Sequence, residues 1–136
     1  MAKTFKLNLI SPGRTTITEE VTQISTKTSD GVVEFLANHA PIICSTIPTI
    51  TTFVKADGGK ESIFTSTGVI TIKDNVLNFC SDSINKPEEI DRDRAEKALE
   101  RANKRLHEDV KDKEKNIDVK RAERALARAK ARLALK

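Results

Sequence analysis

Arginines at helical spacing are the residues of this chain whose type and position could do chemistry. In two successive segments they fall at i, i+7 and i+11, on one helix face each: Arg94, Arg101 and Arg105, and then Arg121, Arg128 and Arg132. A guanidinium group can contact a phosphate or a carboxylate through two hydrogen bonds. Two interpretations stay open: an anion held between the rows, or a solvated charged face with i,i+4 ion pairs such as Glu100–Lys104.

Little else in the sequence points to catalysis or metal binding. Gly58-Gly59-Lys60-Glu61 lacks the Ser or Thr that a phosphate loop needs after lysine, and Val54 stands where that motif has glycine, so a hairpin turn is predicted. His39 near Cys44 is a weak nucleophile–base pair. The histidines have no ligand-spaced companions, and we expect no metal site. Cys44 and Cys80 are expected to be small buried hydrophobic residues.

The composition changes near Asn85-Lys86-Pro87, because every Gly, Thr and Phe lies before this point. In the first part, short segments rich in β-branched residues alternate with turn signals and predict strands. These segments are Thr4–Ile10, Thr15–Thr28, Val32–Leu36, Ile42–Ile47, Ile50–Lys55, Glu61–Ser66, Val69–Lys73 and Val76–Ser81. Asp57-Gly58-Gly59 and Lys73-Asp74-Asn75 are predicted hairpin turns. Short, numerous strands without intervening helices predict a sandwich or barrel.

The second part of the chain is a helical repeat. Ile90–Leu106 and Ile117–Leu133 share the pattern IDxxRAExALxRAxxRL, which puts alanine and leucine on one narrow stripe. The short connector His107–Asn116 predicts an antiparallel hairpin, with helices over about residues 90–107 and 117–134. Because an alanine seam buries little apolar area, we expect the hairpin to be marginal and able to open. Asp91 and Asp118 are the predicted N-caps.

The predicted fold is therefore α+β. An N-terminal antiparallel β-sandwich covers residues 1–84, a linker covers 85–89, and a C-terminal antiparallel two-helix hairpin covers 90–136. No apolar run approaches the ~20 residues of a membrane span, and the N-terminus lacks a secretory signal. We therefore expect a soluble, intracellular protein.

Several motifs in this order resemble the epsilon subunits of bacterial F-type ATP synthases. The stretch from Asp30-Gly31 to Asn38-His39-Ala40-Pro41 is similar to that family's glycine-containing strand and His-x-Pro turn. Ser66-Thr67-Gly68-Val69 is similar to its Ser-Gly-Gly-hydrophobic hairpin, and Ile90–Ala95 fits the Ile/Leu-Asp-x-x-Arg-Ala pattern of its ATP-binding members. The chain departs from the family's common residues at Val32, Glu34, Thr49 and Asn85, where the last replaces a frequent glutamate.

The resemblance implies ATP as a regulatory ligand and no metal. Adenine would contact the start of the first helix, and arginines would contact the phosphates. By matching positions, the ATP-binding residues are Ile90, Asp91, Arg94, Ala95, Arg101, Arg128 and Arg132.

The resemblance also implies a non-catalytic subunit of the ATP synthase central stalk. Such a subunit helps couple ion translocation to ATP synthesis, and it lies peripherally at the cytoplasmic face of the bacterial cell membrane. Its partners would be the gamma subunit, the c-ring and the catalytic beta subunits, with the rotor and c-ring contact at Gly31, Asn38 and His39. Movable C-terminal helices would inhibit ATP hydrolysis by contacting the catalytic subunits through Lys120, Arg121, Arg124 and Lys130.

A basic helical hairpin that binds nucleic acid, or an adaptor with a helical tail, is the alternative. The tail carries more basic than acidic residues, which suits a polyanion. Against nucleic acid, acidic residues are interspersed among the basic ones, and the tail has no aromatic residue to stack on bases.

Overall fold

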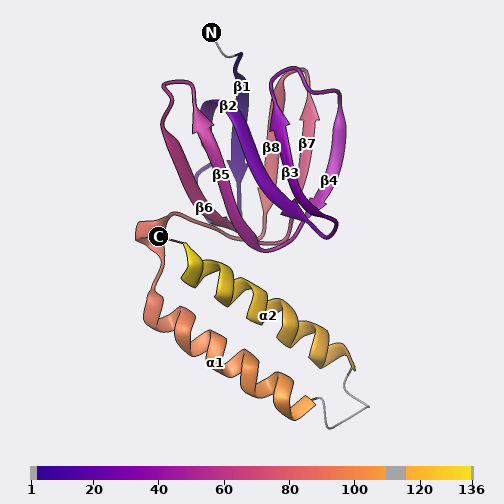
Figure 1. Ribbon diagram of the computed structural model, residues 1–136, viewed down its shortest axis with the longest axis vertical. Coiled ribbons are helices and arrows are strands. Elements are labelled where there is room, and N and C mark those ends of the chain that lie inside the picture. Colours follow the sequence, from indigo (N-terminus) through magenta and orange to yellow (C-terminus); the bar gives the residue numbers. More distant parts are fainter. Residues whose placement is uncertain (1–2, 110–115, 136) are drawn as a thin grey trace.

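The computed structural model describes the backbone of residues 3–109 and 116–135, and the side chains of residues 3–106 and 121–135. In the described chain, strands come first and two helices follow (Figure 1). The strands are β1 (Phe5–Ile10), β2 (Ile17–Thr28), β3 (Gly31–Leu36), β4 (Ile42–Thr46), β5 (Thr49–Lys55), β6 (Lys60–Thr65), β7 (Gly68–Lys73), β8 (Val76–Ser81) and β9 (Ile84–Asn85). A short 3₁₀ turn, η1 (Pro87–Glu89), leads into α1 (Arg92–Asp109) and α2 (Asn116–Ala134).

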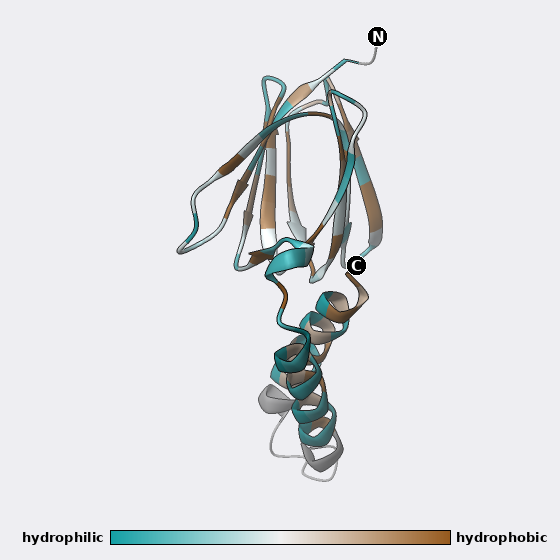
Figure 2. Cartoon of the chain, turned by 90° about the vertical axis from the view of Figure 1, so that its left-hand side faces the viewer, coloured by the Kyte–Doolittle hydropathy of each residue, from teal (hydrophilic) through white to brown (hydrophobic). Residues whose placement is uncertain are grey.

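The strands form one sheet that is folded into two layers. Neighbours follow the order β4-β7-β8-β1-β2-β5-β6-β9, and β3 pairs with β2. The long β2 changes partners along one edge, where Ile17 to Val21 pair with β1 and Gln23 to Thr28 pair with β3. Along its other edge, β2 pairs with β5 from Val21 to Ser25, with a register shift after Val21. This strand therefore passes from one layer to the other, and the layers are seen edge-on in Figure 2. The predicted sandwich is confirmed.

The alternation of side chains along each strand explains which residues form the core. Inward residues of both layers form one apolar cluster, and outward ones meet solvent. The fully buried members include Leu7, Leu9, Val21, Ile24, Phe35, Phe53, Ile70, Leu77 and Phe79. At its edge, Thr51 makes hydroxyl hydrogen bonds to Thr26 at 2.8 Å and to Thr65 at 2.6 Å, so these interior hydroxyls are satisfied.

All eight predicted strands are present, with ends that shift by one or two residues. The predicted turns are confirmed as well, because Gly58, Asp74 and Asn75 have positive φ, as tight hairpins require. Two features differ from the expectation. The two-residue strand β9 is too short to leave a periodic signal, and β1 pairs with β8 in parallel although the rest of the ladder is antiparallel.

The cysteine prediction is wrong in part. Cys44 is half-buried beside the core, but Cys80 is exposed. Phe79 and Ser81, its neighbours in β8, are buried, so the alternation of the strand turns Cys80 outward.

The helical hairpin lies beyond one end of the sandwich, with α2 nearer to the strands than α1 (Figure 1). Its seam is the predicted alanine stripe: Ala95 and Ala102 of α1 and Ala122 and Ala129 of α2 are buried. The first helix begins at Arg92 rather than at Ile90, because Ile90 has extended backbone angles after the 3₁₀ turn. Neither described helix is long and apolar enough to cross a membrane.

Candidate functional site

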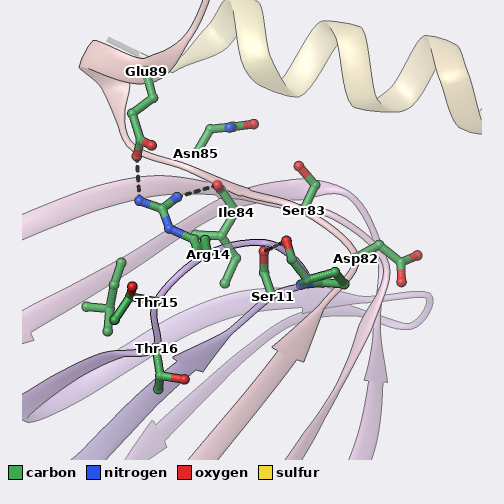
Figure 3. Close-up of a pocket in the computed structure, with 11 residues that line it drawn as sticks. Ser11, Arg14, Thr15, Thr16, Asp82, Ser83, Ile84, Asn85 and Glu89 are labelled. Carbon is green, nitrogen blue, oxygen red and sulfur yellow. Dashed lines mark hydrogen bonds and ion pairs between the residues drawn. The ribbon is translucent and has the colours of Figure 1, made fainter.

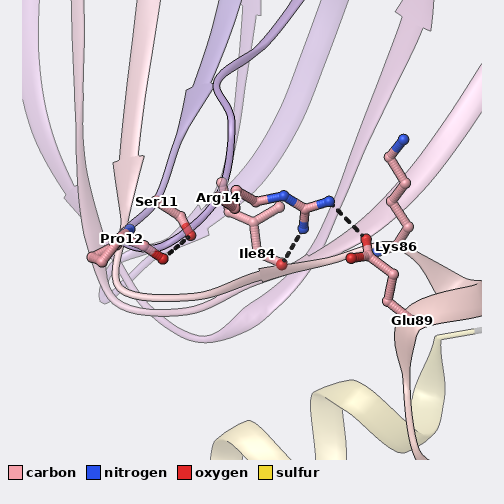
Figure 4. A network of polar contacts seen from close by, with 6 residues as sticks. All are labelled: Ser11, Pro12, Arg14, Ile84, Lys86 and Glu89. Atoms are coloured by element: carbon pink, nitrogen blue, oxygen red, sulfur yellow. Dashed lines mark hydrogen bonds and ion pairs between the residues drawn. The ribbon is translucent and has the colours of Figure 1, made fainter.

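The connection between sandwich and tail is fixed by one ion pair. Arg14, in the loop after β1, donates to the Ile84 carbonyl oxygen at 2.6 Å and to Glu89 Oε1 at 2.9 Å (Figure 3). The same Glu89 oxygen accepts the Lys86 backbone N–H at 2.9 Å, so one carboxylate organises the turn (Figure 4). The start of α1 is thereby held at a set position below the sandwich.

The beginning of α1 is capped as predicted. Asp91 Oδ1 accepts the Arg94 N–H at 3.1 Å, and the Asp91 carbonyl oxygen accepts the Ala95 N–H at 3.0 Å. The side-chain bond satisfies an amide that a helix start otherwise leaves open, and the backbone bond is the first of the helix. The second predicted cap, Asp118, lies in the first turn of α2, and its side chain is outside the described residues.

An unpredicted arginine joins the two helices. Arg92, at the first position of α1, donates to the Leu133 carbonyl oxygen at 3.3 Å and to the Leu135 carbonyl oxygen at 2.9 Å. These carbonyls lie at the end of α2, where a helix lacks its own hydrogen-bond donors and carries partial negative charge. The contact holds the end of α2 beside the start of α1. The repeat pattern gave no signal for it, because Arg92 occupies a variable position.

A cavity of about 410 Å³ opens where α1, α2 and the last strand meet. Six of the seven predicted ATP-binding residues line it: Ile90, Asp91, Arg94, Ala95, Arg101 and Arg132. Ser83, Asn85, Glu89 and Ala98 complete the wall, and the sequence analysis did not assign them to the site. Their nearness could not be read from spacing, since Ser83 and Asn85 meet Arg132 only through the tertiary fold.

Among the residues that line this cavity, Arg132 has the most unusual environment. Its Nε donates to Asn85 Oδ1 at 3.3 Å, and its Nη2 donates to Ser83 Oγ at 3.4 Å. Burial lowers the pKa of this guanidinium, and the charges of Arg128 and Arg94 lower it further. The seventh predicted residue, Arg128, is not among the lining residues, yet it lies close enough to act on Arg132 in this way.

Three arginines line the cavity against two carboxylates, Glu89 and Asp91, so positive charge is in excess. Among the described side chains, ion pairs join Arg14 to Glu89 and Lys55 to Glu61, and none involves Arg94, Arg101, Arg128 or Arg132. The pair Glu100–Lys104, expected for a merely solvated face, is not formed either within the described part of the chain. An anion with several charged oxygens would satisfy these guanidinium groups. Within the same described residues, no cluster of potential metal ligands exists.

A larger hollow of about 590 Å³ lies on the other side of the linker, between Ser11, Thr16 and Asp82 (Figure 3). Its one arginine, Arg14, is already paired with Glu89. This hollow therefore lacks the free positive charge that distinguishes the site between the helices.

The residues predicted to contact the rotor do not share one surface. Gly31 begins β3, whereas Asn38 and His39 follow the end of that strand, so they lie at its opposite ends, roughly 20 Å apart at 3.3 Å per residue. In Figure 1 the β2–β3 turn is at the helix end of the sandwich. Asn38 has a positive φ, and its N–H donates to Asn75 Oδ1 at 2.9 Å. The three residues therefore lie at two ends of the sandwich, and their contact with the rotor and the c-ring stays a prediction.

The predicted inhibitory residues lie on α2. Arg121, Arg124 and Lys130 are exposed, and the side chain of Lys120 is outside the described residues. Their exposure leaves them open to a partner.

The structure gives no support to the other two chemistries considered, a phosphate loop at Gly58–Glu61 and a nucleophile–base pair of Cys44 and His39. Gly59 donates its N–H to Asp57 Oδ1 at 2.8 Å within the predicted hairpin turn. His39 Nδ1 lies 2.6 Å from the Ala40 carbonyl oxygen, and its ring packs edge-on against Phe35. Burial raises the pKa of the Cys44 thiol, which disfavours the thiolate that a nucleophile requires.

Comparison with known proteins gives two family matches that together span nearly the whole chain. Residues 4–87 match the beta-sandwich domain of the ATP synthase Delta/Epsilon chain, and residues 88–136 match its long alpha-helix domain. An ATP synthase epsilon chain of Clostridium acetobutylicum is 40% identical over 106 residues, 78% of this chain and 80% of the relative. The corresponding chain of Clostridium botulinum strain Eklund 17B is 43% identical over 115 residues, 84% of this chain and 86% of the relative.

Solved structures share the fold. A chain in the Euglena gracilis mitochondrial ATP synthase, in a structure of OSCP, F1 and the c-ring, matches with a TM-score of 0.77 and 24% identity. That match covers 94% of this chain and 78% of the other.

Proposed function

This chain belongs to the ATP synthase Delta/Epsilon chain family, and from that membership we propose that it is a non-catalytic central-stalk subunit whose tail senses ATP. The observation that supports ATP sensing is the cavity at the joint between tail and sandwich, where arginines of both helices gather and form no ion pair among the described side chains. ATP supplies the missing negative charge through its phosphates. Its base lies against Ile90 and Ala95, and no metal is needed to complete the arginine set.

ATP acts on this subunit by favouring the folded-back tail. Arg94 lies on α1 and Arg128 and Arg132 lie on α2, so a ligand that contacts all three requires the hairpin to be closed. A ligand at 100 times its dissociation constant stabilises the state that binds it by about 2.7 kcal/mol, enough to turn an even balance into roughly 100:1. Because the seam between the helices is made of alanine, the free-energy difference between the closed and the open tail is small enough for such a ligand to shift it.

The released tail inhibits ATP hydrolysis. It extends towards the catalytic beta subunits, where the exposed Arg121, Arg124 and Lys130 contact acidic surfaces. Lys120 precedes them on the same helix and belongs to the same basic set. The sandwich meanwhile stays on the gamma subunit and transmits rotation as a stiff body.

The end of the sandwich remote from the helices rests on the c-ring. Asn38 and His39 are at that end, and the tail leaves from the other end, where it is free to reach the catalytic head (Figure 1). Gly31 lies at the other end of the sandwich, nearer to the tail. These contacts hold the subunit peripherally at the cytoplasmic face of the bacterial membrane.

The arrangement of the arginines favours a small anion over nucleic acid. Arg132 is half-buried against the sandwich, so a duplex could not reach it without moving the tail. A nucleotide fits into the joint and leaves the tail in place.

Exchange of backbone amides in α2 tests ATP sensing. We expect ATP to slow exchange in the tail of the isolated chain, and we expect Arg94→Ala and Arg128→Ala to abolish this shift, because each removes a phosphate contact. Arg105→Ala is the matched control, since Arg105 is exposed and does not line this cavity. ADP and AMP, which carry fewer phosphates, should act progressively more weakly. An ATP-dependent shift that survives in both variants contradicts the assignment.

A further inference from the structure

Phe64 is fully buried and yet does not belong to the sandwich core. Its strand neighbours Ile63 and Thr65 point inward: Ile63 joins the apolar core, and Thr65 bonds to the interior Thr51. Because side chains alternate along a strand, Phe64 points to the outer face of the sheet. Its exposed fraction is 0%. An outward phenylalanine can be buried only by something that lies on the sheet, and here that is the tail.

The group that covers this ring is a guanidinium. The central carbon of Arg132 lies 4.4 Å from the centre of the Phe64 ring, a distance suited to a cation–π contact. Asn85 pairs with Phe64 across β6 and β9 and accepts the Arg132 Nε hydrogen bond. The outer face of these two strands thus offers a ring for the flat side of the guanidinium and oxygen atoms for its edge.

We propose that Phe64 is a positioning residue that docks the tail on the sandwich by holding Arg132. The contact joins α2 directly to β6, so it stabilises the folded-back tail by itself. It also offsets part of the repulsion among Arg94, Arg128 and Arg132, because the negative face of the ring attracts one member of the cluster.

A second consequence, an effect of Phe64 on ATP binding, rests on the function proposed above. The guanidinium that docks the tail also lines the cavity proposed for ATP. Phe64 therefore holds a phosphate-binding group in place before the ligand arrives, which lowers the ordering cost of binding. Loss of the ring weakens ATP binding although Phe64 does not line the cavity.

The first experiment measures docking in the absence of nucleotide. In Phe64→Leu, which keeps an apolar side chain but removes the ring, amides of residues 121–135 should exchange at least about tenfold faster, as expected for the loss of a desolvated cation–π contact. Phe35→Leu is the matched control, because it makes the same change in the core, beside His39 at the end of the sandwich remote from the tail. That variant should lower the stability of the sandwich and leave exchange in the tail unchanged.

A second variant distinguishes the loss of docking from general misfolding. Arg132→Lys keeps the charge but loses the flat guanidinium, and it changes no core residue. We expect it to accelerate exchange in the tail at least as much as Phe64→Leu does, because it also alters the hydrogen bonds to Asn85 and Ser83. The double variant should be no faster than Arg132→Lys alone, since that variant has already lost the contact with the ring. Additive effects of the two changes, or normal exchange in either variant, would overturn the proposal.

ATP titration of the same proteins distinguishes the docking role of Phe64 from the sensing of ATP. If the unaltered chain shows no response to ATP while Phe64→Leu still releases its tail, the ATP function fails and the docking role stands. If ATP protects the tail equally well in the unaltered chain and in Phe64→Leu, the docking role fails and ATP sensing stands.

Discussion

Arginine residues with the same chemistry have different tasks in this molecule because their neighbours differ. Arg14 is neutralised by Glu89 and fixes the linker. Arg92 satisfies the terminal carbonyls of α2, and Arg132 lies on an aromatic ring. Arg94 and Arg101 face a cavity without an acidic partner among the described side chains. Arg14 and Arg92 make structural contacts, and Arg94 and Arg101 are available to a ligand. Arg132 does both, because it docks the tail and also lines the cavity.

The pH dependence of the linker follows from Glu89. Burial raises the pKa of this carboxyl, but the Lys86 N–H and the Arg14 guanidinium outweigh burial and hold it below its ordinary value. A lowered pKa in the folded state means stabilisation that is present above about pH 4.3, the ordinary value for glutamate, and lost as the pH falls through the folded value.

Glu89→Gln should therefore reduce the free energy of unfolding at pH 7 by less than about 1 kcal/mol, because the pair is partly exposed. The difference from the unaltered protein should disappear as the pH falls towards about 3, below the ordinary range of carboxyl groups. Urea unfolding at a series of pH values measures this. Glu88→Gln serves as the control, since Glu88 forms no ion pair among the described side chains. A pH-independent difference for Glu89→Gln would contradict the role of its charge.

At the scale of the elements, the sandwich and the hairpin differ in the size of the side chains that fill their interiors. The sandwich has a core of large residues such as Phe35, Phe53 and Phe79, while the hairpin seam is made of alanine. Deleting or adding atoms in the core therefore costs much more than in the seam. The contrast suits a stiff body with a tail that can move.

Gly68 shows how tightly the strands approach. A Cβ atom at this position would overlap the Cys80 carbonyl oxygen and lie 2.9 Å from the Ser81 Cα, both on the neighbouring strand. We expect Gly68→Ala to destabilise the sandwich by about 1–3 kcal/mol, as overpacking does, with a lower urea midpoint. Gly59→Ala is the control, because its Cβ would meet only the movable Asp57 carboxylate at 3.0 Å. Equal midpoints for the two variants would show that β7 can move away from β8.

At the scale of the whole molecule, the described contacts between tail and sandwich are mostly polar. They include the Arg14–Glu89 pair at the linker and the contacts of Arg132 with Phe64, Asn85 and Ser83, and α2 also passes close to β5. Among the described residues, none of the tail belongs to the apolar core of the sandwich. The sandwich should therefore stay folded without it.

Removal of residues 88–136 tests this independence. We expect the remaining chain to keep its β-sheet circular dichroism and the slow amide exchange of β1, β2 and β8, although Phe64 becomes exposed. Within a reconstituted ATP synthase, the same deletion should raise ATP hydrolysis at low ATP, since the inhibitory tail is gone. An unfolded remainder would contradict the division into two bodies. Unchanged hydrolysis would contradict inhibition by the tail.

The sequence by itself determined the local structure and the division of the chain. Alternation and turn chemistry predicted eight strands and two hairpin turns, because the pleat and the positive φ of Gly58 and Asn75 are local requirements. The repeated pattern predicted both helices, and Asp91 was recognised as a cap because capping acts within one turn. Six of the ten residues that line the cavity were expected from the family resemblance, whereas helical spacing alone also put Arg105, Arg121 and Arg128 in the two rows, and these do not line it.

Only the tertiary structure decided which distant residues meet. Spacing along the chain says nothing about pairs such as Arg14 and Glu89, Arg92 and Leu135, or Arg132 and Phe64, which lie in different elements. The parallel pairing of β1 with β8 and the separation of Gly31 from Asn38 likewise depend on how the sheet folds over. Local pattern follows from the backbone of each segment, whereas these contacts follow from the packing of whole elements, which no single segment specifies.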